Sequence, residues 1–447
     1  MNILVLNGSP KGDNSVTLQT VLYLAKHFPS DSFEVLCVGQ HIKKLEHDRH
    51  DVCAKIKAAD MLLFSYPVYT FLVPYQLHRF IELLKTDCLC LEGKFAAQIS
   101  TSKHFYDVTA HRFIAENCAD LGLSYLGGLS ADMDDLLTEK GRMQAISFWD
   151  YMRFCAENHI VQPTYKTLAP PRTPYRACVS PTAKSNAYIA VIVIDSATKC
   201  ANLTAMCADF EAAFPYRVKV VELAKFPFKG GCLGCFHCAS SGKCIYTDGF
   251  DSFLREQIQT ADAIVYAFPV QDHSMGSTFK LYDDRQFCNG HRTVTMGTPT
   301  GYLISGDYKY EANLQTVIEG RCEVGGNFLA GVATDEADTD SAGAIVNLAK
   351  SLAFALEHKT ALPQNFYGVG GAKIFRDLIY VMRGLMREDH RFYKAHGFYD
   401  FPQKKQGTVF KMKAVGALLS IPSMQRKMGG RMNDEILKPY KKVIAQK

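Results

Sequence analysis

Four cysteines lie close together in the second half of the sequence, and their spacing is the strongest chemical signal in the chain. They follow the pattern C-x2-C-x2-C-x5-C at Cys232, Cys235, Cys238 and Cys244. With 15 cysteines in 447 residues, chance would produce this spacing roughly 6 times in 10,000. Four thiolates in one loop can bind a 4Fe–4S cluster or a tetrahedral zinc ion. A zinc ribbon needs a second, more distant C-x2-C pair, and none follows, so the spacing favours the cluster. Zinc and metal-free thiols stay as alternatives.

A glycine-bearing loop near the N-terminus has the composition of an anion-binding loop. Residues 8–17, Gly-Ser-Pro-Lys-Gly-Asp-Asn-Ser-Val-Thr, come directly after the apolar run at residues 2–6. Converging N–H groups, hydroxyl donors and a helix N-terminus together bind a phosphate. The loop matches neither G-x-G-x-x-G nor G-x-x-x-x-G-K-[ST], which disfavours a Rossmann dinucleotide site and a P-loop NTPase. The alternative is a polar turn with a capped helix.

Two further loops are expected at the same edge of the predicted sheet. Residues 66–74 follow the third predicted strand and are aromatic and stiffened by proline, and residues 100–107 follow the fourth. Open α/β sheets bind ligands at the carboxyl ends of their strands. One phosphate loop beside two aromatic loops fits FMN, with the phosphate at the first loop and the isoalloxazine between the others. Ser100 and Thr101 begin the third loop and are predicted to contact the cofactor.

The first part of the chain resembles a known family. Residues 1 to about 159 are similar to the flavodoxin-like NAD(P)H-dependent FMN reductases, through Asn7-Gly8-Ser9-Pro10-Lys11, Asn14-Ser15 and the loop Ser65-Tyr66-Pro67-Val68-Tyr69. The resemblance implies NAD(P)H as the electron donor. It also implies that the FMN phosphate is held by Ser9, Lys11, Asn14, Ser15 and Thr17. By the same resemblance, the flavin is lined by Pro67, Val68, Tyr69 and Thr70.

The second half resembles the iron–sulfur flavoprotein branch of that family, which carries this four-cysteine motif at this place in the fold. The similarity covers residues 231–285 and includes Lys280 with Asp284-Arg285. The expected Gly-Ser-Pro loop is replaced by residues 195–202, and its Asp195 would repel a phosphate. We therefore expect no FMN in this half. In homodimeric relatives the resemblance implies a cluster near a flavin across the subunit interface. We expect this chain to fuse that arrangement, with the cysteine loop facing the FMN of residues 8–106.

Two residues of the third loop are candidates for proton donation. Flavin reduction of a carbonyl, quinone or nitro group needs a proton for each hydride, and histidine and tyrosine can supply it. His104 and Tyr106 lie in this loop, so they are the predicted catalytic residues. A histidine in a loop is more often a surface or hydrogen-bonding residue, which is the alternative.

The elements that position these loops follow from hydrophobic periodicity. Short apolar runs alternate with helical patterns through both halves, which indicates parallel sheets with helices on both faces. The predicted fold class is α/β: two tandem flavodoxin-like, doubly wound, five-stranded parallel sheets plus a mainly helical C-terminal extension. The domain prediction is an FMN-binding domain at 1–160, a proline-rich linker at 161–186, a domain with the four-cysteine motif at 187–362, and a basic extension at 363–447.

Charge is distributed unevenly between the predicted domains and the extension. The formal net charge is +5, yet residues 364–447 hold 17 Lys or Arg against 6 Asp or Glu. Three interpretations of this extension are open: a cap on the acidic core, a contact with an anionic membrane surface, or a site for an acidic partner or cofactor phosphate. No nucleic-acid-binding motif accompanies the charge, so we expect no nucleic-acid partner. The N-terminus has no signal-peptide pattern and the cysteines suit a reducing compartment, so we expect a cytoplasmic protein.

The sequence as a whole predicts a flavin-dependent oxidoreductase. It would use FMN and a 4Fe–4S cluster to pass electrons from NAD(P)H or a reduced carrier to a small conjugated acceptor, such as a quinone, flavin or nitro compound. A redox carrier protein and a second copy in a homodimer are the protein partners considered. The alternatives are a non-enzymatic flavodoxin- or ferredoxin-like electron-transfer protein and a zinc-stapled interaction protein without a flavin.

Overall fold

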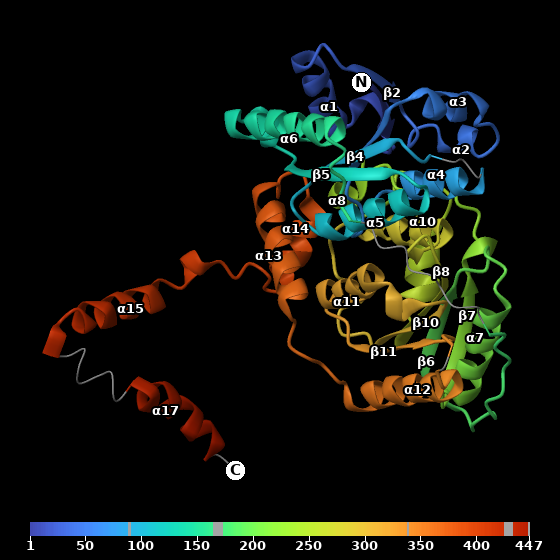
Figure 1. The fold of residues 1–447 in the computed structure, drawn as a ribbon. Helices are drawn as coiled ribbons and strands as arrows, with labels where there is room; N and C mark the ends of the chain where they lie inside the picture. Colours follow the sequence, from blue (N-terminus) through green and yellow to red (C-terminus); the bar gives the residue numbers. More distant parts are fainter. Residues whose placement is uncertain (88–90, 164–172, 338, 424–431, 446–447) are drawn as a thin grey trace. The chain divides into compact units, whose positions relative to one another are not determined.

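The computed structural model describes residues 1–87, 91–163, 173–337, 339–423 and 432–445 (Figure 1). The chain forms two units, Met1–Phe392 and Tyr393–Lys447. The first unit contains both β-sheets. No helix among the described residues is long and apolar enough to cross a membrane.

The first sheet is parallel, with the strand order β2-β1-β3-β4-β5. Its strands are β1 (Asn2–Asn7), β2 (Ser32–Leu36), β3 (Met61–Pro67), β4 (Phe95–Ser102) and β5 (Ser124–Asp132). Its helices are α1 (Val16–His27), α2 (Ile42–Leu45), α3 (His50–Ala58), α4 (Tyr75–Thr86), α5 (Asp107–Asp120) and α6 (Glu139–Glu157). Helices α1 and α6 pack together on one face, while α4 and α5 contribute to the buried cluster on the other. This doubly wound arrangement places the loops after β1, β3 and β4 at one edge.

The second sheet repeats the same order. Its parallel strands lie side by side in the order β7-β6-β8-β10-β11. By their order along the chain, these are the second, first, third, fourth and fifth parallel strands of this half, as in the first sheet. They are β6 (Ser185–Ile194), β7 (Tyr216–Glu222), β8 (Ala263–Gln271), β10 (Thr300–Ser305) and β11 (Leu329–Thr334), and the two-residue β9 (Ser274–Met275) pairs antiparallel with β8. Its helices are α7 (Ala201–Ala213), α8 (His237–Ser241), α9 (Phe250–Ser252), α10 (Ser277–Arg285), α11 (Ala312–Gly325) and α12 (Ser341–His358). The predicted fold class is confirmed, with β9 as an addition.

Strand alternation divides the apolar side chains between three buried clusters. In β1, Leu4 and Leu6 enter a central cluster, while Ile3 and Val5 enter one beneath α1 and α6. The central cluster continues from the first sheet and its helices into α10, α11 and the inner face of the second sheet. A third cluster lies beneath α7 and α12. Successive residues of a strand point to opposite faces, so strands buried on both sides are nearly all apolar.

Equivalent helices of the two halves meet between the sheets. We call each sheet with its helices a domain, and the region where these helices pack together the domain junction. Helix α4 follows the third strand of the first domain, α10 follows the third parallel strand of the second, and the two pack together. Helices α5 and α11, which each follow a fourth strand, also pack together. Figure 1 shows these helices between the two sheets. The two domains therefore associate through matching surfaces, as two subunits of a symmetric dimer do.

The segment between β7 and β8 contains an irregular helix. After the short α9 the chain makes a wider π-helical turn, η4 (Phe253–Ile258). Arg255 in this turn donates to the carbonyl of Gly242 at 2.6 Å and lies near that of Cys288 at 3.4 Å. Such π turns are frequent near functional sites. Here the turn ties the segment to the cysteine loop.

The predicted linker is partly described. Pro170 and Pro171 lie outside the described residues. The described part after them is bound to α7, because Asp209 accepts hydrogen bonds from the backbone N–H groups of Cys178 and Val179. Residues 173–184 have no helix or strand, as their prolines predict, and β6 begins at Ser185, so it includes the last two residues of the predicted linker.

The C-terminal extension is helical where it is described. Helix α13 (Phe366–Val381) packs against α11, and α14 (Arg387–Ala395) follows it. Beyond these lie α15 (Gln406–Leu419) and α17 (Met432–Ile444). The division of the chain after Phe392 places α13 in the first unit. The domain boundary at residue 363 stays a prediction from sequence.

Candidate functional site

The loop after β1 forms a compact cradle at the start of α1. Gly12 has φ +55°, and a Cβ there would lie 2.2 Å from Gln40 Oε1, so the turn needs glycine. The Ser15 side chain caps α1 by accepting from Leu18 N–H at 3.4 Å. Thr17 and the predicted third-loop residue Thr101 share a hydrogen bond of 2.6 Å. Hydroxyls, Lys11 and a helix N-terminus are therefore gathered in one place, and this donor set suits a phosphate.

The loop after β3 is shaped by the second domain. Thr70 and Phe71 both adopt positive φ, at 40° and 71°, which is strained for residues other than glycine. Lys280, which is fully buried, donates to the Tyr69 carbonyl at 3.0 Å and to Thr70 Oγ1 at 2.7 Å. Asp284 forms an ion pair with Lys280 and accepts from Tyr75 N–H at 2.7 Å. The buried pair on α10 thus stabilises the predicted flavin loop of the other domain.

The loop after β4 places its predicted residues in different surroundings. Ser100 is buried and bonds His111 Nε2 at 2.8 Å. His104 has a half-exposed side chain whose Nδ1 lies 2.9 Å from Asp107 Oδ2. Tyr106 packs on Phe71 with ring centroids 3.8 Å apart. A Cβ on Gly320 of α11 would lie 2.5 Å from the Tyr106 hydroxyl, so Tyr106 fills the domain junction.

The cysteine loop lies directly against the first domain. Gly234 has φ +60°, and a Cβ there would lie 1.9 Å from the Tyr69 hydroxyl. Lys11 Nζ lies 5.7 Å from the centre of the Phe236 ring, within cation–π range. Gln76 of α4 donates to the Cys232 carbonyl at 3.3 Å. The cysteine loop therefore touches both the predicted phosphate loop and the predicted flavin loop.

A buried arginine holds the cysteine loop from the other side. Arg285 makes two hydrogen bonds of 2.8 Å to Asp248 and a third of 2.8 Å to the Gly230 carbonyl. Its guanidinium lies 4.5 Å from the centre of the Tyr246 ring. Burial opposes ionisation of Asp248. The hydrogen bonds and charge of Arg285, together with the N–H groups of Lys229 and Phe250, outweigh burial and lower the pKa of Asp248 to about 2. The two ends of the cysteine loop are thus held by one bidentate ion pair.

Burial disfavours the charged form of three thiols in this loop. Burial raises the pKa of Cys238 to about 11 and also raises that of Cys232 and Cys244. Metal binding displaces such protons. No disulfide is recorded for the four cysteines.

One pocket brings the predicted flavin residues and the cysteines together, and we call it the composite pocket. From the first domain it is lined by Ser9, Lys11, Ser15, Thr17, Pro67, Val68, Tyr69, Thr70 and Thr101. From the second domain it is lined by Cys232, Cys235, Cys238 and Cys244, together with Phe236, Tyr246, Arg285, Phe287 and Cys288. Among the predicted residues Asn14, Ser100, His104 and Tyr106 are not in this lining. Their roles stay predictions from sequence.

Sequence reasoning missed a histidine in this pocket. His291 lines it, and its Nδ1 lies 2.9 Å from Asp389 Oδ2 on α14. Asp389 is fully buried, so it fixes the orientation of the imidazole as a carboxylate does in hydrolytic triads. Phe375 and Leu378 of α13 also line the pocket. His291 has no motif around it, and only the folded extension, which carries Asp389, reveals the pair.

The loop after β6 differs from its counterpart after β1. Asp195 is buried, its Oδ2 has no hydrogen-bond partner, and burial raises its pKa. A second carboxylate, Asp335, accepts from Ser305 Oγ, Gly306 N–H and Asn202 Nδ2, each at 2.7 Å. Two acidic groups at these strand ends are unfavourable for a phosphate. The expectation that this domain binds no FMN stays a prediction from sequence.

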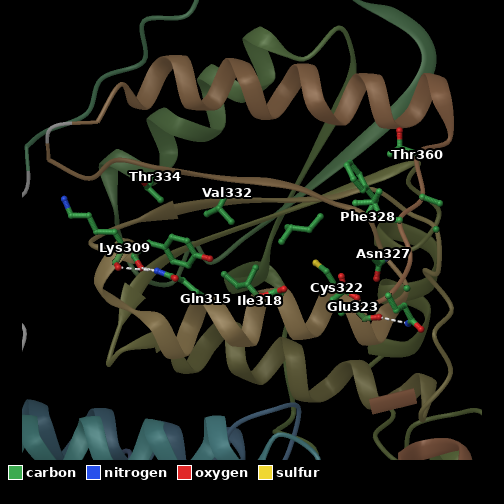
Figure 2. Close-up of a pocket in the computed structure, with 18 of the residues that line it drawn as sticks. Lys309, Gln315, Ile318, Cys322, Glu323, Asn327, Phe328, Val332, Thr334 and Thr360 are labelled. Atoms are coloured by element: carbon green, nitrogen blue, oxygen red, sulfur yellow. Dashed lines mark hydrogen bonds between the residues drawn. The ribbon is translucent and has the colours of Figure 1, made fainter. Parts of the chain in front are cut away.

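A second cavity, of about 660 Å³, lies in the second domain beside α11 (Figure 2). Ile318, Cys322 and Val332 point into it, and Lys309 and Glu323 lie at its polar rim. None of the residues predicted for FMN or the cluster lines this cavity. Neither the residues of the phosphate loop nor the four clustered cysteines line this cavity, so the composite pocket is the better candidate for the functional site.

Comparison with known proteins agrees with the predicted resemblance. Residues 1–112 match the family of NADPH-dependent FMN reductases. A curated relative, an iron–sulfur flavoprotein of Archaeoglobus fulgidus, is 27% identical over 174 residues, which cover 37% of this chain and 79% of that protein. Among solved structures, an FMN-dependent NADH-azoreductase from Bacillus anthracis in complex with FMN is 13% identical, with a TM-score of 0.27, over 35% of this chain and 98% of the other. An NAD(P)H:quinone oxidoreductase from Methanothermobacter marburgensis is 12% identical, with a TM-score of 0.27, over 37% and 98%. The family match confirms the resemblance predicted from the Asn7-Gly8-Ser9-Pro10 loop.

Proposed function

We propose that this protein is an FMN-dependent NAD(P)H oxidoreductase that also carries a 4Fe–4S cluster and reduces a small conjugated acceptor. The observation that carries the proposal is the composite pocket, where the FMN-reductase loops of one domain and the four cysteines of the other line the same space. In this arrangement two electron carriers would lie side by side within one polypeptide.

The first domain supplies residues that fit FMN. Ser9, Ser15 and Thr17 with the start of α1 would bind the phosphate, and Lys11 would balance its charge. The aromatic rings of Tyr69 from this domain, and of Phe236 and Phe287 from the second domain, offer flat surfaces for the isoalloxazine. When bound, FMN supplies hydride and single-electron chemistry, while the protein orients it and excludes competing reactions.

The cysteine geometry favours a cluster over zinc. In a tetrahedral zinc site with bonds of about 2.3 Å, the sulfurs lie about 3.8 Å apart. Among the described residues, one group of metal-ligand side chains has its ligand atoms all within 4.8 Å, and it contains none of these cysteines. The C-x2-C-x2-C-x5-C spacing suits a cubane, and the curated relative is named an iron–sulfur flavoprotein.

The acceptor would enter along the apolar rim formed by Phe105, Phe375 and Leu378. Such a rim suits a planar, conjugated molecule such as a quinone, flavin or nitroaromatic. His291, held by Asp389, is placed to donate the proton that accompanies each hydride. Nicotinamide recognition would rely on stacking within the same pocket.

Anaerobic purification followed by counting of FMN, iron and sulfide per chain tests the proposal. We expect one FMN and about four iron and four sulfide per chain, together with oxidation of NADH or NADPH in the presence of a quinone or ferricyanide. Two FMN per chain, or no iron after anaerobic reconstitution, would contradict it. Bound FMN and iron without any NAD(P)H oxidation would instead indicate an electron carrier that needs a redox partner protein.

A further inference from the structure

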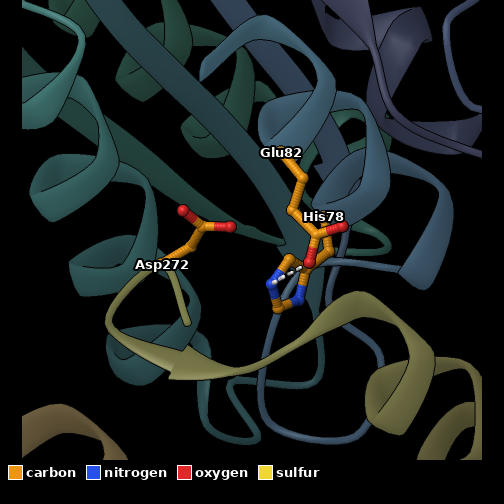
Figure 3. A group of neighbouring side chains, drawn as sticks. All are labelled: His78, Glu82 and Asp272. Carbon is orange, nitrogen blue, oxygen red and sulfur yellow. Dashed lines mark ion pairs between the residues drawn. The ribbon is translucent and has the colours of Figure 1, made fainter. Parts of the chain in front are cut away.

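A group of buried ligand-type side chains lies at the domain junction, away from the cysteine loop. His78 and Glu82 are one turn apart on α4, and Asp272 lies in the turn between β8 and β9 of the second domain (Figure 3). Each residue offers one ligand atom, and these atoms all lie within 4.8 Å of one another. Residues four apart on a helix share a face, so His78 and Glu82 approach Asp272 together.

His78 gives the clearest indication that this group binds a ligand. Its side chain is fully buried, and neither ring nitrogen has a hydrogen-bond partner. Buried polar groups are nearly always paired, because an unpaired one loses its hydration without compensation. Asp272 Oδ2 is also buried without a partner. Unpartnered atoms of two residues from different domains therefore lie close together.

The chemistry of the three groups suits a transition metal. Both ring nitrogens of the buried His78 lack a hydrogen-bond partner, so a nitrogen lone pair of the imidazole is available to a metal. One imidazole nitrogen with two carboxylates is a ligand set that zinc accepts, with a water molecule as the fourth ligand. Because this set contains no sulfur, it belongs to a different class from the cysteine loop.

The neighbouring charges leave the required oxygen positions available. Lys85 pairs with Asp272 Oδ1 at 2.9 Å and leaves Oδ2 free. Ser277 donates to both oxygens of Glu82, and Arg79 donates to Oε2 at 3.0 Å. A carboxylate accepts about four hydrogen bonds or metal contacts in all. Glu82 Oε1, which is the oxygen 3.9 Å from His78 Nε2, therefore retains an acceptor position.

We propose that His78, Glu82 and Asp272 bind one zinc ion at the junction of the two domains. The ion would join α4 to the turn after β8. Helix α4 begins directly after the loop at residues 66–74, and β8 is the strand before α10. A metal here would therefore fix the relative position of two elements that adjoin the walls of the composite pocket, because Thr70 before α4 and Arg285 at the end of α10 line that pocket.

Zinc counting on cluster-loaded protein tests this proposal, because occupied cysteines cannot take up the added metal. The wild-type chain, loaded anaerobically and dialysed against dilute Zn²⁺, is expected to hold one zinc per chain by elemental analysis. His78→Gln and Asp272→Asn should each lose that equivalent while keeping their iron. Glu311→Gln is the matched control, because Glu311 belongs to the same polar junction, binds His273 and is as exposed as Asp272, at 12%. It should keep its zinc.

Diffraction at the zinc edge gives a readout that does not depend on the variants. An anomalous peak between His78 and Asp272 in wild-type crystals soaked in Zn²⁺ would support the site. Wild-type protein without zinc would overturn the proposal, as would zinc contents that are equal in wild type and both ligand variants. Loss of zinc from Glu311→Gln to the same extent would also overturn it, since the acidic junction as a whole would then be responsible.

Discussion

Replacing Gly234 with alanine should disturb the flavin loop without removing any predicted cofactor ligand. The new Cβ would lie 1.9 Å from the Tyr69 hydroxyl, whereas ordinary contact begins at 3.4 Å. Either Tyr69 or the cysteine loop must then move by about 1.5 Å. The positive φ of Gly234 adds a backbone cost of roughly 1–2 kcal/mol for alanine.

Gly249→Ala separates these two effects. Gly249 has φ +79° but no atom within 4 Å of a Cβ, so this variant carries only the backbone cost. Both variants should therefore lose roughly 1–2 kcal/mol of unfolding free energy. Only Gly234→Ala should also lose function, because a displacement of about 1 Å at a reacting centre can lower a rate about a hundredfold.

FMN titration of the apoprotein and NAD(P)H oxidation at saturating acceptor measure the difference. We expect Gly234→Ala to bind FMN more weakly and to turn over at least about tenfold more slowly than Gly249→Ala. Denaturant unfolding of both variants provides the stability control. Equal FMN affinity and equal turnover in the two variants would refute the idea that contact between the cysteine loop and Tyr69 positions the flavin.

Four further outcomes can be checked on the same protein. Cys235→Ser should lower the iron content after anaerobic reconstitution and leave FMN binding intact, whereas Cys288→Ser, which changes a thiol of the same pocket outside the motif, should keep its iron. His291→Gln should lower turnover with a quinone by on the order of a hundredfold without loss of FMN; turnover within twofold of wild type would exclude proton donation by His291. The pKa of Asp248 is lowered to about 2 in the folded chain, whereas the pKa of an aspartate in an unfolded chain is about 3.9. The ionised Asp248 therefore contributes its full stabilisation above about pH 3.9, and this contribution is lost as the pH falls towards 2. Urea midpoints should accordingly fall less steeply between pH 4 and 2 for Asp248→Asn than for wild type. A chain ending after Lys405 lacks the exposed Phe410 and Met412 and the lysines beside them. This shortened chain should therefore sediment less than the full chain with anionic vesicles. Equal sedimentation of the two chains would argue against a membrane role for α15.

The sheets and the first loop could be predicted because their signals are local. The run at residues 2–6 is apolar throughout and becomes β1, and the Gly-Ser-Pro-Lys-Gly segment after it must turn towards a helix. Hydrophobic periodicity gave both sheets, since parallel strands are buried on both faces. The two-residue strand β9 was missed because it is too short to show any alternation.

The contacts at the domain junction could not be predicted from the sequence alone. Lys280 and Asp284 appeared in the sequence as a family resemblance, but their action on Tyr69 and Thr70 depends on packing of α10 against α4. Tyr106 is a predicted proton donor, and its packing against Gly320, on a helix more than 200 residues away in sequence, could not be predicted from its loop. The pair of His291 with Asp389 likewise joins residues 98 positions apart. Such contacts leave no periodic pattern in a single sequence.

The matching helix pairs at the junction bear on how the protein behaves when it is dilute. A pocket assembled from two separate subunits falls apart as their concentration drops below the dissociation constant of the dimer. In this chain both walls of the composite pocket belong to one polypeptide, so each wall experiences the other at an effective concentration on the order of millimolar. Specific activity should therefore stay constant from micromolar to nanomolar protein, and the pocket would survive the dilution that separates a two-chain counterpart.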